Sequence, residues 1–248
     1  MKRVTLVIPC FNEADRWLDG YWTTLLEAGL RLVFVDDGST DATAQRIAAS
    51  SDHAYASAVL LPENRGKGEA VRAGLLHALQ SDTDIVGFLD ADGAFPSEEV
   101  VRLAQMSEGL LLSNSQRYEA VWSARVQLAG RNISRHVSRH YIGRVVATAI
   151  APWHGYDLYD TQSGYKLLRA NDILNAALQQ PFETRWFFDV ELLQRWRKIT
   201  GEAMPIWEEP VVGWHDVGGS KINKSQGKQL IKDALALRQG RFSRGSQA

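Results

Sequence analysis

Residues 32–41 read LVFVDDGSTD, a short apolar run followed at once by two aspartates, a glycine and further polar residues. Residues 4–13 (VTLVIPCFNE) and 85–93 (IVGFLDADG) show the same change from apolar to polar. Runs of this kind predict buried strands at 4–8, 32–35, 58–61 and 85–89. Helical spacing is found between them, at 14–28, 42–50 and 68–79. Wholly apolar strands that alternate with helices predict an α/β fold, with a mostly parallel sheet flanked by helices on both faces.

The rest of the chain is less regular. Helical patterns cover about 131–150, 186–197 and 225–237, with a polar loop after the first of them. No internal repeat, low-complexity linker or change in composition marks a domain boundary. We therefore expect a single domain with an α/β front half and a more specialised back half.

The composition of the 248 residues is that of a globular protein, with 45% hydrophobic and 23% charged residues. The single cysteine, Cys10, excludes a disulfide framework and a zinc site built from several cysteines. A formal net charge of −1 predicts no general attraction to nucleic acid. No stretch reaches the roughly 20 apolar residues that cross a bilayer, and the first apolar run meets Pro9 too early for a signal peptide. We expect a cytoplasmic protein.

Polar or acidic residues follow each of the four predicted strands. Because ligands of open parallel sheets bind beyond the carboxyl ends of the strands, four such ends in succession predict one site. Asp90 and Asp92, one residue apart after the last of these strands, can hold a hard cation such as Mg²⁺ or Mn²⁺. Such a cation neutralises charge on a departing diphosphate. The alternative for this pair is a solvated turn or a helix cap.

Two common phosphate-binding motifs are missing from the sequence. No G-x-G-x-x-G follows the first strand, which argues against an NAD-type Rossmann fold, and the glycines around Lys67 lack the spacing of a P-loop. Lys67 still stands at the start of a predicted helix, where it can approach a phosphate of a nucleotide. The turn that follows Asp37 has an alternative interpretation, in which Ser39 or Thr40 caps the next helix.

Ordered motifs along most of the chain resemble glycosyltransferase family 2, whose members use nucleotide-diphospho sugars. The first half carries P-x-F-N-E at 9–13, V-D-D-G-S-T-D at 35–41, E-N-x-G-K-G-x-A at 63–70 and F-L-D-A-D at 88–92. The second half continues with S-A-R at 123–125, D-T-Q-S-G-Y-K at 160–166, F-D-V-E-L-L at 188–193 and G-S-K at 219–221. The series spans about 4–238 and is similar to the polyprenyl-phosphate branch, especially the dolichyl-phosphate β-glucosyltransferases.

The resemblance implies a GT-A-type, Rossmann-like fold. It places a family 2 domain at 1–240, with a nucleotide-sugar-binding half at about 1–125 and an acceptor-side half at about 126–240. Residues 241–248 would then be a flexible tail.

The resemblance also implies roles for the matched residues. The nucleoside of a UDP- or GDP-hexose donor would be held by Pro9, Phe11, Glu13 and Asp37. Asp90 and Asp92 would bind the metal, Mg²⁺ or Mn²⁺, together with the sugar diphosphate. Arg125 and Lys221 would face phosphate oxygens, with an ordinary salt bridge as the alternative for both. Two departures, Ala94 where the family often has a polar residue and Ser123-Ala124 in place of Gly-Ser, leave the metal coordination open in detail.

Asp189 is predicted to lie on the apolar face of its helix, in line with Leu192, Leu193 and Trp196. A carboxylate on an apolar face needs a partner or a function. Either Asp189 forms an internal salt bridge, or it lies near the acceptor as a catalytic base. Glu191 lines up with the polar residues Gln194, Arg195 and Lys198, and we expect it to be solvated.

Residues 131–144 form the most basic stretch of the chain. Arg131, Arg135 and Arg139 fall on one stripe of the predicted helix, and Arg144 continues it. Such a helix can lie peripherally at an anionic membrane surface or receive a phosphate-bearing acceptor. A solvated basic face is the alternative.

Together with these features, the resemblance implies an inverting, metal-dependent hexosyltransferase. It would move glucose or mannose from a nucleotide-diphospho sugar to a polyprenyl or dolichyl phosphate, while the metal, Arg125 and Lys221 stabilise negative charge on the leaving diphosphate. A lipid phosphate is already anionic and needs no strong base, whereas a hydroxyl acceptor would need one, for which Asp189 is the candidate. Two alternatives stay open: the same transfer to a soluble or glycan hydroxyl, and a non-catalytic nucleotide-sugar binding protein.

Overall fold

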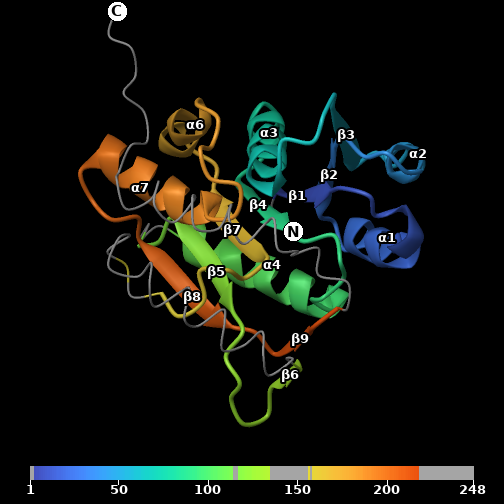
Figure 1. Cartoon of the computed structure of the whole chain (residues 1–248). Helices are drawn as coiled ribbons and strands as arrows, with labels where there is room; N and C mark the ends of the chain where they lie inside the picture. Colours follow the sequence, from blue (N-terminus) through green and yellow to red (C-terminus); the bar gives the residue numbers. More distant parts are fainter. Residues whose placement is uncertain (1–2, 114–116, 135–155, 157, 218–248) are drawn as a thin grey trace, which may run out of the picture.

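The computed structural model describes residues 3–113, 117–134, 156 and 158–217 (Figure 1). Seven of its strands form one sheet in the order β3-β2-β1-β4-β7-β5-β8, and two short strands, β6 and β9, form a second. The strands are β1 (Val4–Cys10), β2 (Arg31–Asp37), β3 (Ala56–Leu61), β4 (Ile85–Leu89), β5 (Ala120–Ala124), β6 (Asn132–Ser134), β7 (Tyr165–Arg169), β8 (Ile206–Pro210) and β9 (Gly213–His215). The predicted α/β fold with a mostly parallel sheet is confirmed.

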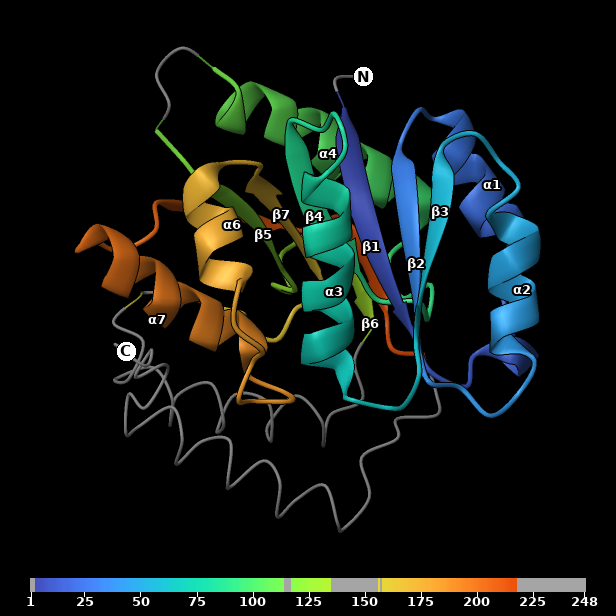
Figure 2. The same cartoon turned by 90° about the horizontal axis from the view of Figure 1, so that it is seen from above.

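Strands β1, β2 and β4 are parallel neighbours and are buried along almost their whole length. Their β-branched and aromatic side chains suit a sheet that is covered on both faces. Figure 2 shows β1 and β2 from the side, running from the top of the view to the bottom. The carboxyl ends of these strands therefore lie at the same edge of the sheet, and so do the polar residues that follow each strand.

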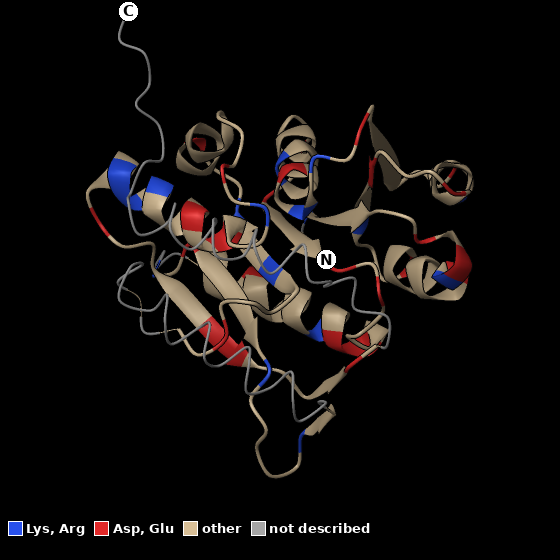
Figure 3. Ribbon diagram, in the orientation of Figure 1, with Lys and Arg blue, Asp and Glu red and all other residues tan. Residues whose placement is uncertain are grey.

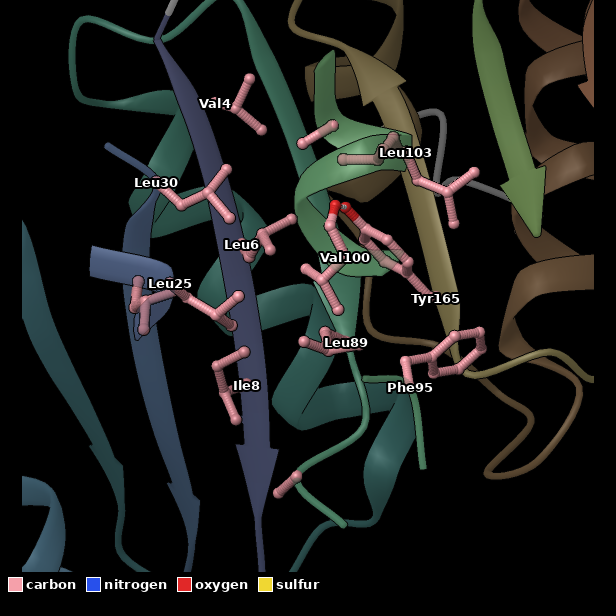
Figure 4. Close-up of a cluster of buried hydrophobic side chains, with 14 of the residues drawn as sticks. Val4, Leu6, Ile8, Leu25, Leu30, Leu89, Phe95, Val100, Leu103 and Tyr165 are labelled. Atoms are coloured by element: carbon pink, nitrogen blue, oxygen red, sulfur yellow. Dashed lines mark hydrogen bonds between the residues drawn. The ribbon is translucent and has the colours of Figure 1, made fainter. Parts of the chain in front are cut away.

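The helices cover the sheet in two layers (Figure 2). One layer packs on the cluster around Val7 and Phe88, and consists of α3 (Lys67–Leu79), α6 (Asp172–Leu178) and α7 (Phe188–Thr200). The other packs on the cluster around Leu6 and Ile8, and consists of α1 (Asp19–Glu27), α2 (Thr43–Ser50) and α4 (Ser97–Leu111). Figure 4 shows this second cluster, in which the hydroxyl of Tyr165 donates to the carbonyl of Val100 at 2.9 Å.

Strand β7 enters the sheet against the direction of its neighbours. It pairs antiparallel with β4 on one side and with β5 on the other, so that Lys166 lies opposite both Phe88 and Trp122. Successive side chains of a strand point to opposite faces. Accordingly, Tyr165 joins the core under α4, whereas Lys166 lies on the face that α7 covers.

Local patterning predicted the first four strands and the helices α2, α3 and α7 closely. The helix expected at 14–28 is shorter, because a 3₁₀ turn at Ala14–Arg16 and an extended Trp17 precede α1. The helix expected from Arg131 is wrong at its start, where Asn132–Ser134 form β6 and pair in parallel with β9. Partners distant in sequence thus override the local helical spacing. Residues 135–150, the helix expected at 225–237 and the tail 241–248 lie outside the described residues.

Among the described residues, no helix is both long enough and apolar enough to span a bilayer. Both acidic and basic residues are spread over the helices, strands and loops of this part of the chain (Figure 3).

Candidate functional site

Asp37 lies at the end of β2, where its carboxylate organises the loop that follows β3. One oxygen accepts a hydrogen bond from the amide of Arg65 at 2.7 Å and the other from the amide of Gly66 at 2.8 Å. Burial raises the pKa of Asp37, and these two hydrogen bonds oppose the rise. The next residue, Gly38, has φ +65° and packs so closely on the backbone of Glu63 that a Cβ would collide with it.

The loop after β1 is joined to the loop after β2 by hydrogen bonds. The amide of Asn12 donates to Ser39 Oγ at 3.0 Å, and Asn12 Oδ1 accepts from the amide of Thr40 at 2.9 Å. Neither Ser39 nor Thr40 caps α2, so that alternative is wrong, because both residues are engaged with Asn12 instead. The amide of Thr43, at the start of α2, bonds to Asp41.

Of the residues expected to hold a nucleoside, Pro9 is half-buried near the end of β1, and Phe11 and Glu13 follow in the loop after this strand. The carboxylate of Glu13 is paired with Arg16. No motif in the sequence pointed to Arg16. Its pKa is raised chiefly by Glu13 and further by the charges of Asp92 and Asp90, which places this guanidinium within electrostatic reach of the aspartate pair.

Asp90 and Asp92 lie directly after β4, at the same edge of the sheet. Asp92 Oδ1 accepts from the amide of Ala94 at 3.0 Å, and Asp90 Oδ1 lies 2.5 Å from Lys67 Nζ at the start of α3. Burial raises the pKa of Asp92, and repulsion by the Asp90 carboxylate raises it further. The structure thus brings Lys67 to Asp90, while its approach to a phosphate stays a prediction.

The two carboxylates are a suitable donor set for a hard divalent cation, which would relieve their mutual repulsion. Within the described parts of the chain, no group of three or more His, Cys, Asp and Glu side chains gathers around one point. The amide of His215, on β9, bonds to the carbonyl of Ala94 at 3.0 Å and so adjoins this loop.

Arg125 follows β5 and is held by Asp160. Its Nε and Nη2 donate to the two carboxylate oxygens at 2.7 and 2.8 Å, and its amide donates to Oδ2 at 3.1 Å. The guanidinium carbon also lies 5.1 Å from the ring centre of Trp214. The salt bridge considered as an alternative for Arg125 is therefore present. A role of Arg125 at a phosphate stays a prediction.

Asp189 lies in the first turn of α7 and is only 4% exposed. Its Oδ2 accepts from Lys166 Nζ at 2.5 Å. The internal salt bridge considered for Asp189 is thus confirmed, while its role as a base stays a prediction. Neither Lys166 nor Asp160 was assigned a role from the sequence, although a lysine inside the apolar run YKLLR was a signal that it needs a buried partner.

The expectation that Glu191 is solvated is wrong, since its exposed fraction is 0%. Glu191 Oε1 lies 2.5 Å from Arg195 Nη2, and its Oε2 accepts from the amide and hydroxyl of Thr184. Arg195 in turn donates to the carbonyls of Ala177, Gln180 and Pro181. The loop before α7 folds over this side of the helix, so the part of the polar face that holds Glu191 and Arg195 is buried with these two charges paired. Lys221, Arg135, Arg139 and Arg144 lie outside the described residues.

The chain is similar to known proteins in sequence and in fold. The model of Glycosyl transferase family 2 matches residues 5–113. A dolichyl-phosphate beta-glucosyltransferase of Trichomonas vaginalis is 30% identical over 247 residues, which cover 94% of this chain and 69% of that protein. A dolichyl-phosphate beta-glucosyltransferase of Saccharomyces cerevisiae is 29% identical over 256 residues, which cover 95% and 74%.

A solved structure is similar over nearly the whole chain. It is glucosyl-3-phosphoglycerate synthase of Mycobacterium tuberculosis in complex with Mn²⁺, UDP and glucosyl-3-phosphoglycerate. It matches with a TM-score of 0.65 at 21% identity, and covers 98% of this chain and 82% of that chain. The likeness confirms the GT-A-type fold that the motifs implied.

Proposed function

Because this chain belongs to glycosyl transferase family 2, we propose that it transfers a hexose, with inversion, from a nucleotide-diphospho sugar to a polyprenyl phosphate. The observation that carries the proposal is the gathering of Asp37, Asp90 and Asp92 at one edge of the sheet, with Lys67 beside them. The names of the two curated relatives support glucose as the hexose and a dolichyl-type phosphate as the acceptor.

In this proposal the loops after β1 and β2 hold the nucleoside. Asp37 fixes the backbone at 65–66, and Gly38 permits the close approach of the neighbouring loop. Pro9, near the end of β1, and Phe11 and Glu13, in the loop after it, are proposed to contact the nucleoside from this side. The preorganised amides and carboxylates let the site bind a base and ribose without rearrangement.

In this proposal the diphosphate lies at the same edge of the sheet, beside the ends of β4 and β5, near Lys67 and Arg125. Asp90 and Asp92 would hold Mg²⁺ or Mn²⁺, which when bound supplies Lewis-acid stabilisation of the charge that develops on the leaving diphosphate. Lys67 and Arg125 add fixed positive charge there, and Lys221 is proposed to do the same. The acceptor attacks the anomeric carbon from the face opposite the diphosphate, which inverts that carbon.

A polyprenyl phosphate reaches this site as an anion, so its oxygen attacks without a general base. The pairing of Asp189 with Lys166 agrees with such an acceptor, because this carboxylate is occupied by a buried ammonium. Peripheral contact with the membrane through Arg131, Arg135, Arg139 and Arg144 completes the proposal.

The test is to incubate the purified chain with Mg²⁺ or Mn²⁺, a panel of UDP- and GDP-hexoses and short polyprenyl phosphates, and to detect lipid-linked product by mass spectrometry. We expect a hexosyl phosphate lipid with one of the donors, and its loss in Asp92→Asn. Asp82→Asn is the matched control, because this exposed aspartate precedes β4 at the opposite end of the strand.

Other outcomes separate the alternatives. Product only with sugar or glycan hydroxyls would replace the lipid phosphate by a hydroxyl acceptor. Donor binding without any transfer would favour a nucleotide-sugar binding protein. Full activity of Asp92→Asn would overturn the assignment of the metal site.

A further inference from the structure

The ammonium of Lys166 is buried within the sheet, with an exposed fraction of only 1%. Its Nζ lies 4.4 Å from the ring centre of Trp122 and 5.3 Å from that of Phe88, the two residues opposite it on β5 and β4. Burial lowers the pKa of Lys166, and the carboxylate of Asp189 opposes this. Such a charge is retained at a large desolvation cost, which calls for a function beyond packing.

All three donors of this ammonium are used. One donates to Asp189 Oδ2 at 2.5 Å, and the other two donate to the carbonyls of Thr161 at 2.8 Å and Ser163 at 3.0 Å. Asp189 is in turn fixed at the start of α7 by a hydrogen bond from the amide of Val190 at 2.9 Å. The pair therefore ties the loop 160–164 to α7.

This loop contacts two residues of the proposed diphosphate site. The carbonyl of Gly164 accepts from the amide of Asp90 at 2.9 Å, and its Cα packs against the Asp90 side chain. At the other end of the loop, Asp160 holds the guanidinium of Arg125. Glu208 fixes this end by accepting from the amides of Tyr159 and Asp160. One short loop thus sets the positions of a predicted metal ligand and a predicted phosphate-binding cation.

We propose that Lys166 and Asp189 are positioning residues, which act through the loop 160–164 to place Asp90 and Arg125 for the diphosphate and its metal. This proposal rests on the proposed function in one respect, namely that Asp90 and Arg125 bind the metal and the diphosphate. Asp189 takes no proton from the acceptor and touches no reacting atom. Groups that orient metal ligands are worth about 10-fold to 100-fold in metal affinity in other proteins, which sets the size of the expected effect.

Three variants of the full chain test the proposal. Asp189→Asn removes one charge of the pair, and the double variant Lys166→Met/Asp189→Leu replaces both partners by apolar side chains. Glu191→Gln is the matched control, since it alters a second buried ion pair of α7 that does not contact the loop 160–164. Titration calorimetry measures the affinity for UDP and GDP with Mn²⁺, thermal unfolding measures stability, and hydrogen-exchange mass spectrometry follows the amides of Asp90 and Arg125.

We expect Asp189→Asn to weaken nucleotide and Mn²⁺ binding roughly 10-fold to 100-fold. The double variant should regain stability, because apolar replacement of a buried ion pair is often neutral, yet should keep the weak binding and exchange both amides faster. Glu191→Gln should leave both amides as protected as in the wild type.

Wild-type binding and wild-type exchange in the double variant would overturn the proposal, as they would show that the pair only stabilises the fold. Normal nucleotide and Mn²⁺ affinity in Asp189→Asn, with transfer lost, would also overturn it and would favour a catalytic base. If the wild type binds neither UDP nor GDP, the proposed function fails, whereas the exchange of the two amides still decides the positioning role.

Discussion

Gly164 packs directly against the carboxylate of Asp90, and its carbonyl accepts a hydrogen bond from the Asp90 amide at 2.9 Å. The contact joins β7 to the end of β4, two elements that are far apart in the chain. It leaves no room for a Cβ at position 164, since the added atom would collide with Asp90 Oδ2. The position of a predicted metal ligand therefore depends on the absence of a side chain at Gly164.

Gly164→Ala should displace the Asp90 carboxylate and weaken metal-dependent binding of the nucleoside diphosphate by about tenfold or more. Calorimetric titration with Mn²⁺ and UDP or GDP measures this effect. Gly109→Ala is the control, because a Cβ at this position of α4 meets nothing within 4 Å. That variant should bind normally and gain up to about 1 kcal/mol of stability from the helix propensity of alanine. Equal affinities of the two variants would contradict the role of Gly164.

The raised pKa of Asp92, caused by burial and by the Asp90 charge, predicts two opposite dependences on pH. Metal binding requires the ionised carboxylate. As the pH is lowered, the affinity for Mn²⁺ should therefore begin to fall at a higher pH than it would for an aspartate of ordinary pKa. The contribution of Asp92 to the free energy of unfolding, measured without metal, should instead increase as the pH is lowered. A carboxyl whose folded pKa exceeds its unfolded value contributes stability that is fully present below the unfolded pKa and is lost as pH rises through the folded pKa.

Urea denaturation of the wild type and of Asp92→Asn, repeated between neutral pH and pH 4 without metal, checks this dependence. The free energy of unfolding of the wild type should improve relative to the variant as the pH falls. A constant difference across this range would show that the pKa of Asp92 is not raised.

Arg195→Ala should destabilise the fold by about 3–5 kcal/mol, because it leaves the buried Glu191 carboxylate without its counter-charge. It also removes the hydrogen bonds that Arg195 donates to the carbonyls of the loop before α7. Urea denaturation provides the measurement. Arg197→Ala, at an exposed position of the same helix, should stay within about 0.5 kcal/mol of the wild type. Similar losses for the two arginines would contradict the buried pair.

Asp37→Asn should weaken nucleotide binding and lower stability by about 1–3 kcal/mol. An amide side chain has one acceptor oxygen, so it leaves the amide of Arg65 or that of Gly66 unsatisfied. Chemical denaturation and titration with UDP or GDP measure the two effects. Asp52→Asn is the control: it removes one carboxylate at an exposed position and should change neither stability nor nucleotide binding. Wild-type stability of Asp37→Asn would show that these two hydrogen bonds contribute little.

The parts of the fold that local patterning predicts are those whose signal lies within one segment. The runs at 4–8, 32–35 and 85–89 are apolar because both of their faces are buried, and they are indeed strands with polar ends. Their parallel order follows from the intervening helices, and the shared edge follows from that order. The sequence was therefore sufficient to predict that Asp37, Asp90 and Asp92 lie at one edge of the sheet.

What could not be predicted depends on partners distant in the chain. Asn132–Ser134 form a strand because β9 lies beside them, and Glu191 is buried because a loop covers it and Arg195 neutralises it. The same holds for Asp160 and Lys166, whose roles appear only when the loop 160–164 is seen next to Asp90. No periodicity within one helix or strand carries this information.

The central place of β7 has a consequence for how the chain acquires its fold. Until Tyr165–Arg169 has been synthesised, β4 presents an open, largely apolar edge with unpaired backbone groups. A nascent chain that contains only the first four strands is therefore prone to pair with other strands, and we expect it to depend on chaperones or on rapid elongation. Closure of this edge, a contact between distant parts of the chain, should be the slow step of folding. It should also be the step that assembles the surroundings of Asp90.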